Sequence, residues 1–575
     1  MKTLESMIEK SSQDELEELP IGQEANGEIH IKTYLLIVAI NLVYVAQLIS
    51  VVGSGSLARN ITAVVGGEDK TVWFTSIITI VTTVLSPPIS QAADYWGRKW
   101  LLIFCTSMGV VGSLIISRAQ NVGTLLVGFT FSGIAFGAQP LIPTVSSEVV
   151  PRKLRSYAQA FVNFVGAAAA LVALLIGGGL TRYGHNANFR IYFYICAGVF
   201  ALGALATGLL YHPPPRDLQK NLTFKEKMRQ LDWPAYFLLT SGLVLFCIGL
   251  SWSQNPYPWS DARVSAPFAV GVVLLICLVL YVCFIKKDGM IHHSLFRHRN
   301  FPIALGCLFA EGLSFFSFNN YLPFETSILF TTDPLMIGLH FGIAFIASIP
   351  ISAVGGAWSY HTKTLRPPAM FALLLFVAFF ATIATVNVHT DPANFWGYPV
   401  IAGSGLALCI VCLMTLAQFA TPPELISTTT GLVIAVRNLG GTVGLAIYNA
   451  VFNSCMSNNL GPKIAAATLP LGLPESSLGP FIGAITADNQ TALAHIPHVN
   501  EAIIAAGALA VKETYVVCFR YVWVTAGSFA AAALIASLFI RDPKSEFNLH
   551  IDAPVEVVGA VSPVEKVTTR HSTEA

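Results

Sequence analysis

The run YLLIVAINLVYVAQLISVVGSG occupies residues 34–55 and contains no charged side chain. A helix needs about 20 mostly apolar residues to cross the hydrocarbon core of a bilayer. Lipid offers no partners to backbone N–H and C=O groups, and the run is about twice the length of a barrel strand, so we predict a transmembrane helix. Thirteen similar runs follow, at about 72–92, 100–118, 123–143, 157–179, 191–211, 235–253, 264–285, 302–322, 335–358, 368–388, 396–418, 429–453 and 516–540. The sequence therefore predicts an all-α membrane protein with fourteen transmembrane helices.

The composition is typical of a protein that lies in lipid. Of the 575 residues, 54% are hydrophobic and only 11% are charged, whereas soluble globular proteins carry about 25% charged residues. The net charge of +1 provides no basic excess to neutralise phosphates, so we predict no nucleic-acid partner. No segment brings together a nucleophile, a base and metal ligands, so we predict a protein that is not an enzyme and binds no cofactor or metal.

The distribution of Lys and Arg predicts the orientation of the chain. With the N-terminus inside, the inner segments hold most of the 33 Lys and Arg residues, in agreement with the positive-inside rule. An even number of helices then places both termini in the cytoplasm. The polar, acidic residues 1–33 lack the apolar core of a cleavable signal peptide, so the first helix has to direct insertion. We expect the plasma membrane, with the vacuole or an intracellular vesicle as alternatives, and a protein that acts as a monomer.

Two longer segments separate groups of helices. Residues 212–234 form a basic, proline-led inner linker, and residues 455–514 form a long outer loop flanked by Cys455 and Cys518. These two cysteines form either a disulfide or two free thiols. The predicted organisation is a disordered cytoplasmic tail (1–33), an N-terminal six-helix half (34–211), a linker with two inserted helices and an inner loop (212–301), a C-terminal six-helix half that includes the outer loop (302–540) and a second cytoplasmic tail (541–575).

Two sequons for N-glycosylation fall on the predicted outer side, at Asn60 and Asn489. A third, at Asn221, falls on the inner side and should remain unmodified. Asn60 and Asn489 are therefore the candidate glycosylation sites.

The segment after the second predicted helix reads SQAADYWGRK at residues 90–99. Gly97 permits a tight turn, and Arg98 and Lys99 hold the turn on the cytoplasmic side. Asp94 can pair with Arg98 or with the positive N-terminus of a neighbouring helix. Such a cluster either locks one conformation of the protein or is a plain turn whose cations reach the membrane surface.

This segment resembles the signature loop of the major facilitator superfamily, Gly-x-Leu-Ala-Asp-Arg-x-Gly-Arg-Lys, at Ala93, Asp94 and the Gly97–Lys99 triplet. Further resemblances follow in the family's order. They are Glu148–Arg155 between helices 4 and 5, Arg190–Tyr194 at the start of helix 6, and Arg437–Gly444 in helix 13, which is similar to the Arg-x-Leu-Gly-Gly signature of the fourteen-helix drug:proton antiporter branch.

Within that branch, Tyr211-His-Pro-Pro-Pro followed by Leu231-Asp-Trp looks most like the fungal trichothecene-efflux-pump group, to which siderophore-iron transporters are related. The resemblance implies a major facilitator fold, with two six-helix halves related by a pseudo-twofold axis, two inserted helices and alternating access to a central cavity. We expect the signature loop and the inner gate to involve Asp94, Gly97, Arg98, Lys99, Glu148, Arg152 and Arg437.

The resemblance further implies proton-coupled efflux of a bulky hydrophobic toxin or drug, similar to a trichothecene. The partners would be this small molecule, protons and the bilayer. Phe129 stands where many proton-coupled exporters have an arginine, and Leu174 or Leu175 replaces the proline of helix 5. Import of ferric siderophores on the same fold is therefore the alternative, and a nutrient receptor that does not transport shares the fold as well.

Charged residues inside the bilayer cost roughly 2.5–3.5 kcal/mol or more, so each one is a functional candidate. Glu311 lies near the middle of the ninth helix, where burial favours a neutral carboxyl that ionises when water reaches it. It is either a proton-coupling site or a hydrogen-bonded carboxyl in the core. Arg437 in helix 13 either reaches Asp94 or Glu148 as a gate latch or extends to lipid phosphate. His340 in helix 10 either senses protons or makes a hydrogen bond in an outer vestibule.

Polar and aromatic side chains within the predicted helices indicate where the cargo binds. Phe315 and Phe318 next to amides suit a bulky, weakly polar ligand, although phenylalanines that face lipid are the alternative. The candidate cavity residues are Asn41 and Gln47 in helix 1, Asn163 in helix 5, and Phe315, Phe318 and Asn319 in helix 9.

Overall fold

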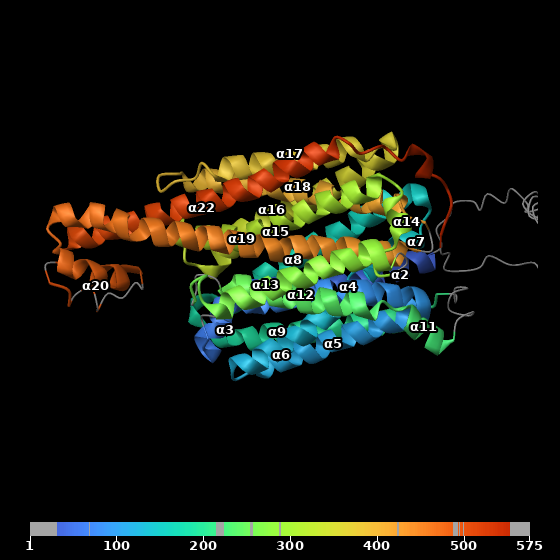
Figure 1. Cartoon of the computed structure of the whole chain (residues 1–575), viewed down its shortest axis with the longest axis horizontal. Coiled ribbons are helices and arrows are strands. Elements are labelled where there is room, and N and C mark those ends of the chain that lie inside the picture. Colours follow the sequence, from blue (N-terminus) through green and yellow to red (C-terminus); the bar gives the residue numbers. More distant parts are fainter. Residues whose placement is uncertain are drawn as a thin grey trace, which may run out of the picture.

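The computed structural model describes residues 31–552 apart from 68–69, 214–222, 253–256, 287–288, 423–424, 487–490, 492, 494 and 498. Within these residues, fourteen helical segments are long and apolar enough to cross a membrane. They run side by side along the long axis of the molecule (Figure 1). The protein is a multi-pass, all-α membrane protein, as the sequence predicts.

The first half of the chain forms a bundle of six spans. Their ends agree with the sequence-based ranges within a few residues, except that the fourth span continues after a short break as a separate helix. The helices are α2 (Ile31–Ser56), α4 (Thr71–Trp96), α5 (Arg98–Arg118), α6 (Val122–Gly137) with α7 (Leu141–Glu148), α8 (Arg155–Thr181) and α9 (Phe189–Leu210); the short α3 (Ala58–Val65) follows α2.

The second bundle also has six spans, and two further spans with two short helices precede it in the chain. The second bundle consists of α15 (Asn300–Leu329), α16 (Pro334–Thr362), α17 (Arg366–Ile383), α18 (Pro392–Phe419), α19 (Ile426–Thr468) and α22 (Glu501–Ser537). Between the bundles lie α11 (Phe224–Gln230), α12 (Trp233–Trp252), α13 (Ala262–Leu280) with a π-helical turn at Tyr281–Ile285, and α14 (His293–Phe296).

The contacts between helices repeat from one half to the other. In the first half α2 packs on α8 and α9, α4 on α6, and α5 on α6 and α9; in the second half α15 packs on α19 and α22, α16 on α18, and α17 on α18 and α22. The contacts between the halves are reciprocal, because α4 packs on α19 and α8 packs on α16. The second helix of each half thus meets the fifth helix of the other, which is the pattern that a twofold axis between the halves produces.

The two ends of the bundle differ. We call the end where α2 begins and α22 finishes the terminal end, and the end that carries α20 (Glu475–Thr486) the distal end (Figure 1). At the distal end, Asp261, Asp333 and Asp391 cap the first turns of α13, α16 and α18 through their carboxylates. These caps satisfy backbone N–H groups where each helix starts.

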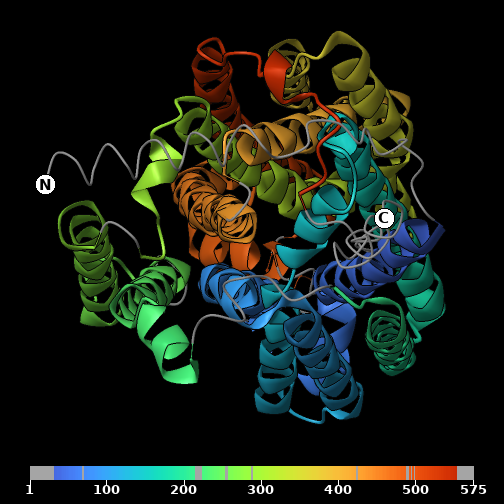
Figure 2. The same cartoon turned by 90° about the vertical axis from the view of Figure 1, so that its right-hand side faces the viewer.

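The inserted helices α12 and α13 pack mainly on each other, and α12 also packs on α4 and α19 of the main bundle. Seen from the terminal end, the pair stands at the side of the bundle (Figure 2). Most of the outer face of α13 is exposed apolar surface, with Val273, Ile276 and Val279 among its residues. Such a surface suits contact with lipid.

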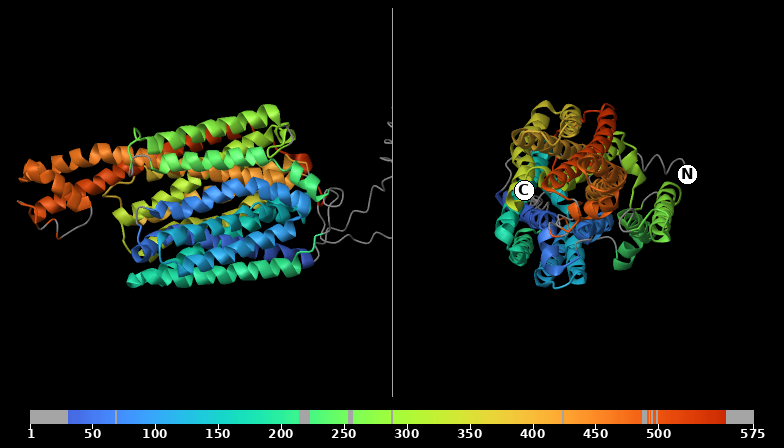
Figure 3. Two further views of the ribbon diagram at one scale, coloured as in Figure 1. Left: turned by 60° about the horizontal axis from the view of Figure 1, so that its bottom comes forward. Right: turned by 90° about the vertical axis from the view of Figure 1, so that its left-hand side faces the viewer.

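The predicted outer loop at 455–514 is largely helical, which corrects the description of this segment as a loop. Helix α19 continues to Thr468, α22 begins at Glu501, and α20 lies between them. Together they protrude from the distal end (Figure 3). Residues such as Ile464 of α19, Phe481 of α20 and Ile503 of α22 form a separate small core. Each of these helices turns an apolar face toward this core. The segment as a whole is nevertheless too polar to be read as a membrane span.

Some sequence-based predictions lie outside the described residues, and others can be located in the structure. Residues 1–30 of the predicted tail at 1–33 and the sequon at Asn489 lie outside, whereas residues 31–33 belong to α2. The amide of Asn60 donates to the side-chain oxygen of Asn186 at 2.7 Å. Cys455 and Cys518 are buried, free thiols.

Candidate functional site

A cavity lies between the two halves, enclosed by helices of both. The space between the lining side chains is ≈ 840 Å³, including the part that is open to solvent. The lining residues are Tyr44, Leu48, Val51, Val52, Thr75, Ile78, Thr79, Thr82, Phe136, Gln139, Asn163, Gly166 and Ala167 from the first half, and Phe315, Phe316, Asn319, Phe345, Ser348, Leu406, Ile410, Arg437 and Asn438 from the second.

Glu311 and Arg437 form a bidentate ion pair at the wall of this cavity. Arg437 donates from Nε to Glu311 Oε2 at 2.5 Å and from Nη2 to Glu311 Oε1 at 2.9 Å. The Glu311 side chain is fully buried, whereas 15% of the Arg437 side chain is exposed. The guanidinium also lies 5.1 Å from the centre of the Phe315 ring. Two parallel hydrogen bonds and an aromatic face hold this cation at the cavity surface.

Glycines bring the backbones of α15 and α19 close enough for this pair to form. A Cβ at Gly312 would overlap the carbonyl oxygen of Arg437, and one at Gly440 would overlap the carbonyl oxygen of Phe309. A Cβ at Gly441 would overlap the ring of Phe316. The Arg-Asn-Leu-Gly-Gly segment therefore works as a unit, because small residues allow the close approach that puts the arginine opposite its carboxylate.

The rest of the cavity combines aromatic rings with uncharged polar groups. Asn163 Nδ2 donates to Ser352 Oγ at 2.7 Å, which joins α8 to α16 across the two halves. Among the described residues, the buried hydroxyl of Ser348 lines the cavity without a protein partner. Amides and hydroxyls of this kind can bind the oxygen atoms of an otherwise apolar ligand.

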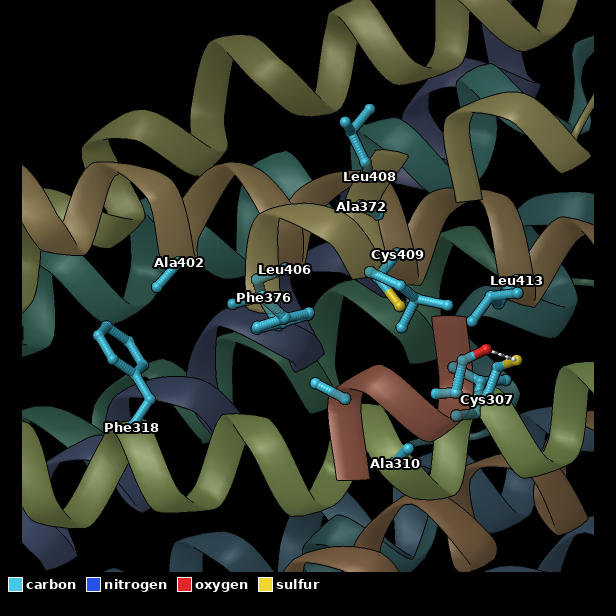
Figure 4. Close-up of a cluster of buried hydrophobic side chains, with 14 of the residues drawn as sticks. Cys307, Ala310, Phe318, Ala372, Phe376, Ala402, Leu406, Leu408, Cys409 and Leu413 are labelled. Atoms are coloured by element: carbon cyan, nitrogen blue, oxygen red, sulfur yellow. Dashed lines mark hydrogen bonds between the residues drawn. The ribbon is translucent and has the colours of Figure 1, made fainter. Parts of the chain in front are cut away.

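Three predicted cavity residues lie elsewhere, which corrects the sequence-based set. Asn41 donates to the Ile37 carbonyl of its own helix at 2.8 Å, and Gln47 donates to the Ala135 carbonyl at 2.8 Å. Phe318 packs against Phe341 and Phe379, with ring centroids 5.0 and 5.5 Å apart. It belongs to the cluster of buried hydrophobic side chains shown in Figure 4. Asn163, Phe315 and Asn319, in contrast, line the cavity.

The predicted latch between Arg437 and Asp94 or Glu148 is not formed. Arg437 lies roughly 15 Å further along α19 than Ser427, at a rise of 1.5 Å per residue, and it pairs with Glu311 instead. Arg98 makes the contact across the halves. Its Nε donates to Ser427 Oγ at 3.0 Å and its Nη2 donates to Glu148 Oε1 at 2.7 Å.

Comparison with known proteins identifies the family. The family model of the Major Facilitator Superfamily matches residues 36–445. The chain belongs to the major facilitator superfamily. The model of the fungal trichothecene efflux pump (TRI12) matches residues 335–556 in addition.

Relatives of this superfamily transporter align over most of the chain at low identity. The MFS-type transporter gkaD of Penicillium citrinum is 26% identical and covers 76% of this chain and 74% of its own length. The efflux pump FUS6 of Gibberella fujikuroi is 24% identical and covers 91% of this chain and 92% of its own length. The trichothecene efflux pump TRI12 of Trichoderma arundinaceum is 22% identical and covers 96% of this chain and 94% of its own length.

Solved structures confirm the major facilitator fold. The human organic anion transporter MFSD10 (TETRAN) superimposes with a TM-score of 0.53 at 13% identity, over 88% of this chain and 99% of that protein. The proton:xylose symporter XylE superimposes with a TM-score of 0.52 at 10% identity, over 90% of this chain and 97% of that protein.

The signature loop of this superfamily transporter closes the terminal end. Gly97 has a φ of 92° and makes the break between α4 and α5, in a region that favours glycine. Asp94 accepts a hydrogen bond from Thr428 Oγ1 at 3.0 Å in the first turn of α19, where the helix dipole favours a carboxylate. With the Arg98–Ser427 bond, these contacts form a lock between the first half and α19, which we call the terminal lock.

A second ion pair joins the halves at the distal end. Arg182, just after α8, donates from Nη2 to Asp333 Oδ2 at 3.0 Å, and both side chains are about one-third exposed. A Cβ at Gly178 would come within 3.1 Å of the Leu335 backbone, so α8 and α16 are in close contact here. The transporter is therefore joined across its halves at both ends, with the cavity between them.

The remaining predicted gate and coupling residues lie outside the cavity. Lys99 Nζ lies 5.9 Å from the Trp100 ring on the terminal surface, and Arg152 pairs with the C-terminal segment. His340 Nδ1 bonds to the Met336 carbonyl at 2.8 Å, and its ring lies 3.7 Å from that of Trp396.

Sequence reasoning missed seven polar residues that line the cavity: Tyr44, Thr75, Thr79, Thr82, Gln139, Ser348 and Asn438. The signal for Tyr44 was a polar side chain inside a long apolar run, opposite Gly166 of α8, whose lack of a Cβ leaves room for the ring. Gln139 lies in the break between α6 and α7, which the reading of one continuous span concealed.

Proposed function

We propose that this transporter exports a bulky, uncharged, oxygen-bearing hydrophobic compound in exchange for protons, by alternating access. The observation that carries the proposal is the character of the cavity. Arg437 is the one charged residue among its described lining residues, and the buried Glu311 neutralises it. A cavity without excess charge, lined by phenylalanines and amides, favours a neutral ligand over an ionic one.

The relatives support export as the direction of transport. Two trichothecene efflux pumps, from Trichoderma arundinaceum and Fusarium sporotrichioides, and the efflux pump FUS6 are named for this activity. A trichothecene-like sesquiterpenoid is rigid, apolar and oxygenated, which fits aromatic rings beside amide and hydroxyl donors.

The Glu311–Arg437 pair is the proposed site of proton coupling. As long as Glu311 is ionised, its two hydrogen bonds hold Arg437. Protonation of the carboxyl from the cavity side would remove the charge partner and release the guanidinium toward the cavity and the face of Phe315. Because the released Arg437 side chain would occupy the cavity, the protein could not bind cargo and proton at the same time. Mutually exclusive binding of the two leads to exchange of cargo for protons.

The terminal lock and the Arg182–Asp333 pair are the proposed gates. Alternating access requires one end to open while the other stays closed. The terminal end is the proposed cytoplasmic end, because the positive-inside rule places the termini there. We further propose the plasma membrane as the location and the monomer as the working unit.

The test is transport in proteoliposomes that contain the purified protein. An acid lumen should drive accumulation of a radiolabelled trichothecene in vesicles whose transporter exposes its cytoplasmic face, and a protonophore should abolish it. Accumulation of a ferric siderophore driven by external acid would instead support the importer. No movement of either compound, together with retained ligand binding, would favour a receptor.

The amide of Asn319 gives a prediction about specificity. Replacement by leucine should raise the KM for an oxygen-bearing cargo by about 5–30-fold, because a ligand oxygen would lose a hydrogen bond in a partly dry cavity. The neighbouring Asn320 is the matched control. Its amide donates to the Phe316 carbonyl at 3.0 Å and it is absent from the lining, so Asn320→Leu should leave the KM within about twofold. Initial rates of uptake at several cargo concentrations measure both values, and equal shifts would remove Asn319 from the binding site.

A further inference from the structure

The segment after α22 is anchored to its own half over its first residues. Asn300 Nδ2 donates to the Arg541 carbonyl at 2.7 Å, and the Arg541 N–H donates to Asn300 Oδ1 at 3.0 Å. The carboxylate of Asp542 accepts from the N–H groups of Leu365 and Arg366 at 2.7 and 2.8 Å. It therefore caps the start of α17, where backbone donors are otherwise unpaired.

The same segment then crosses to the first half of the molecule. Phe547 packs on Phe419 at the end of α18, with ring centroids 4.9 Å apart. Beyond this point the N–H groups of Arg152 and Lys153 donate to the carbonyls of His550 and Asn548 at 2.9 and 2.8 Å. The chain thus runs from the last helix of the second half to the connection between α7 and α8.

A cluster of ion pairs fixes the far end of this segment. Arg152 pairs with Glu546 at 2.7 Å and with Asp552 at 3.1 Å. Asp552 also pairs with Arg155 in the first turn of α8, and both side chains are only 1% exposed. The guanidinium of Arg155 lies 5.7 Å from the centre of the Phe419 ring, so the pair is placed at the boundary between the two halves.

We propose that residues 541–552 form a strap that holds the terminal end closed and releases when that end opens. The inference rests on the proposed alternating access. When the halves separate at the terminal end, the second half carries Asp542 and Phe419 away from Arg152 and Arg155. The strap cannot keep both sets of contacts, and the buried Asp552–Arg155 pair must then return to water.

A buried ion pair is suited to such a role. Its two charges regain hydration when they separate, so breaking the intact pair has a moderate cost. If one of the two charges is removed, the other is left buried and unpaired. This penalty applies only to the closed state, because the remaining charge is hydrated in the open state. A change at Asp552 should therefore shift the population toward the state that is open at the terminal end, without altering the cavity.

The experiment measures access to the terminal end in membranes. The reporter is the cysteine introduced by Gln418→Cys, at a buried position where Gln159 Nε2 meets Gln418 Oε1 across the halves at 3.3 Å. The exposed Cys277 and Cys283 are replaced by serine in all proteins. Asp552→Asn should raise the rate of maleimide labelling roughly tenfold, and the charge exchange Arg155→Asp with Asp552→Arg should return it toward the parent rate.

Truncations provide the matched control. A chain that stops after Asp552 keeps the strap and should label at the parent rate. A chain that stops after Ile540 lacks the strap and should label as fast as Asp552→Asn. If Asp552→Asn fails to reach the membrane, Glu546→Gln loosens only the contact to Arg152 and should give a smaller increase.

Three results would overturn the strap: parent-like labelling in Asp552→Asn, parent-like labelling in the chain that stops after Ile540, or, where Glu546→Gln has to be used, no increase with that variant. The labelling needs no cargo. A transporter that moves no trichothecene but labels as expected would contradict the proposed function and leave the strap in place.

Discussion

Glu311→Gln is expected to abolish proton-driven export while the protein still reaches the membrane. Glutamine has nearly the same shape and can still accept one hydrogen bond from Arg437, but it neither carries charge nor exchanges a proton. Because glutamine cannot take up or release a proton, a pH gradient should no longer drive accumulation of the cargo in proteoliposomes that contain this variant.

Glu325→Gln is the matched control for this experiment. Glu325 lies on the same helix, is 1% exposed and accepts a hydrogen bond from Trp523 Nε1 at 3.0 Å. Its partner Trp523, unlike Arg437, is not one of the residues that line the cavity. Its substitution should leave pH-driven accumulation within about threefold of the parent. Unchanged pH dependence in Glu311→Gln, or an equal loss in both variants, would exclude Glu311 as the coupling site.

Gly312→Ala is expected to disrupt the packing of α15 on α19 and, with it, transport. The added Cβ would overlap the carbonyl oxygen of Arg437 and lie 2.9 Å from its carbonyl carbon. These are backbone atoms, so no side-chain rotation can relieve the overlap and the two helices must separate. Overpacking typically costs about 1–3 kcal/mol, and separation would also move Arg437 away from Glu311. The apparent melting temperature of the purified protein in detergent should fall, and transport should be lost.

Gly306→Ala tests the same substitution on the same helix without the overlap. Nothing lies within 4 Å of a Cβ at Gly306, and alanine is about 1 kcal/mol better than glycine inside a helix. This variant should melt at the parent temperature or slightly above it. If Gly312→Ala is as stable and active as Gly306→Ala, the close approach of α15 and α19 is not required.

One face of α15 shows how far sequence reasoning could identify the site. Glu311, Phe315 and Asn319 follow each other at intervals of four residues and therefore share a helix face. All three lie at or behind the cavity wall. Phe318 stands seven residues after Glu311 and three after Phe315, a spacing that also belongs to this face, yet its ring packs into the core against Phe379. Helical spacing alone could not separate Phe318 from the cavity residues, because it does not tell which part of the face meets the cavity.

The pairing of Glu311 with Arg437 depends on two segments that are 126 positions apart. Each residue stood out as a charge in an apolar run. Their contact required the rotation of both helices about their axes and the close approach that Gly312, Gly440 and Gly441 permit. Neither the rotation of the helices nor the distance between them can be read from a local sequence pattern. The predicted partners of Arg437, Asp94 and Glu148, were wrong for this reason.

The sequence by itself determined the number of membrane spans, their approximate ends and the superfamily. Lipid imposes this result on each segment separately, because a spanning helix must satisfy its own backbone and cover it with apolar side chains. Only the tertiary structure decided which polar side chains face the cavity, that Arg98 rather than Arg437 joins the halves at the terminal end, and that residues 541–552 cross between the halves. These contacts join distant parts of the chain, and their geometry follows from the packing of whole helices.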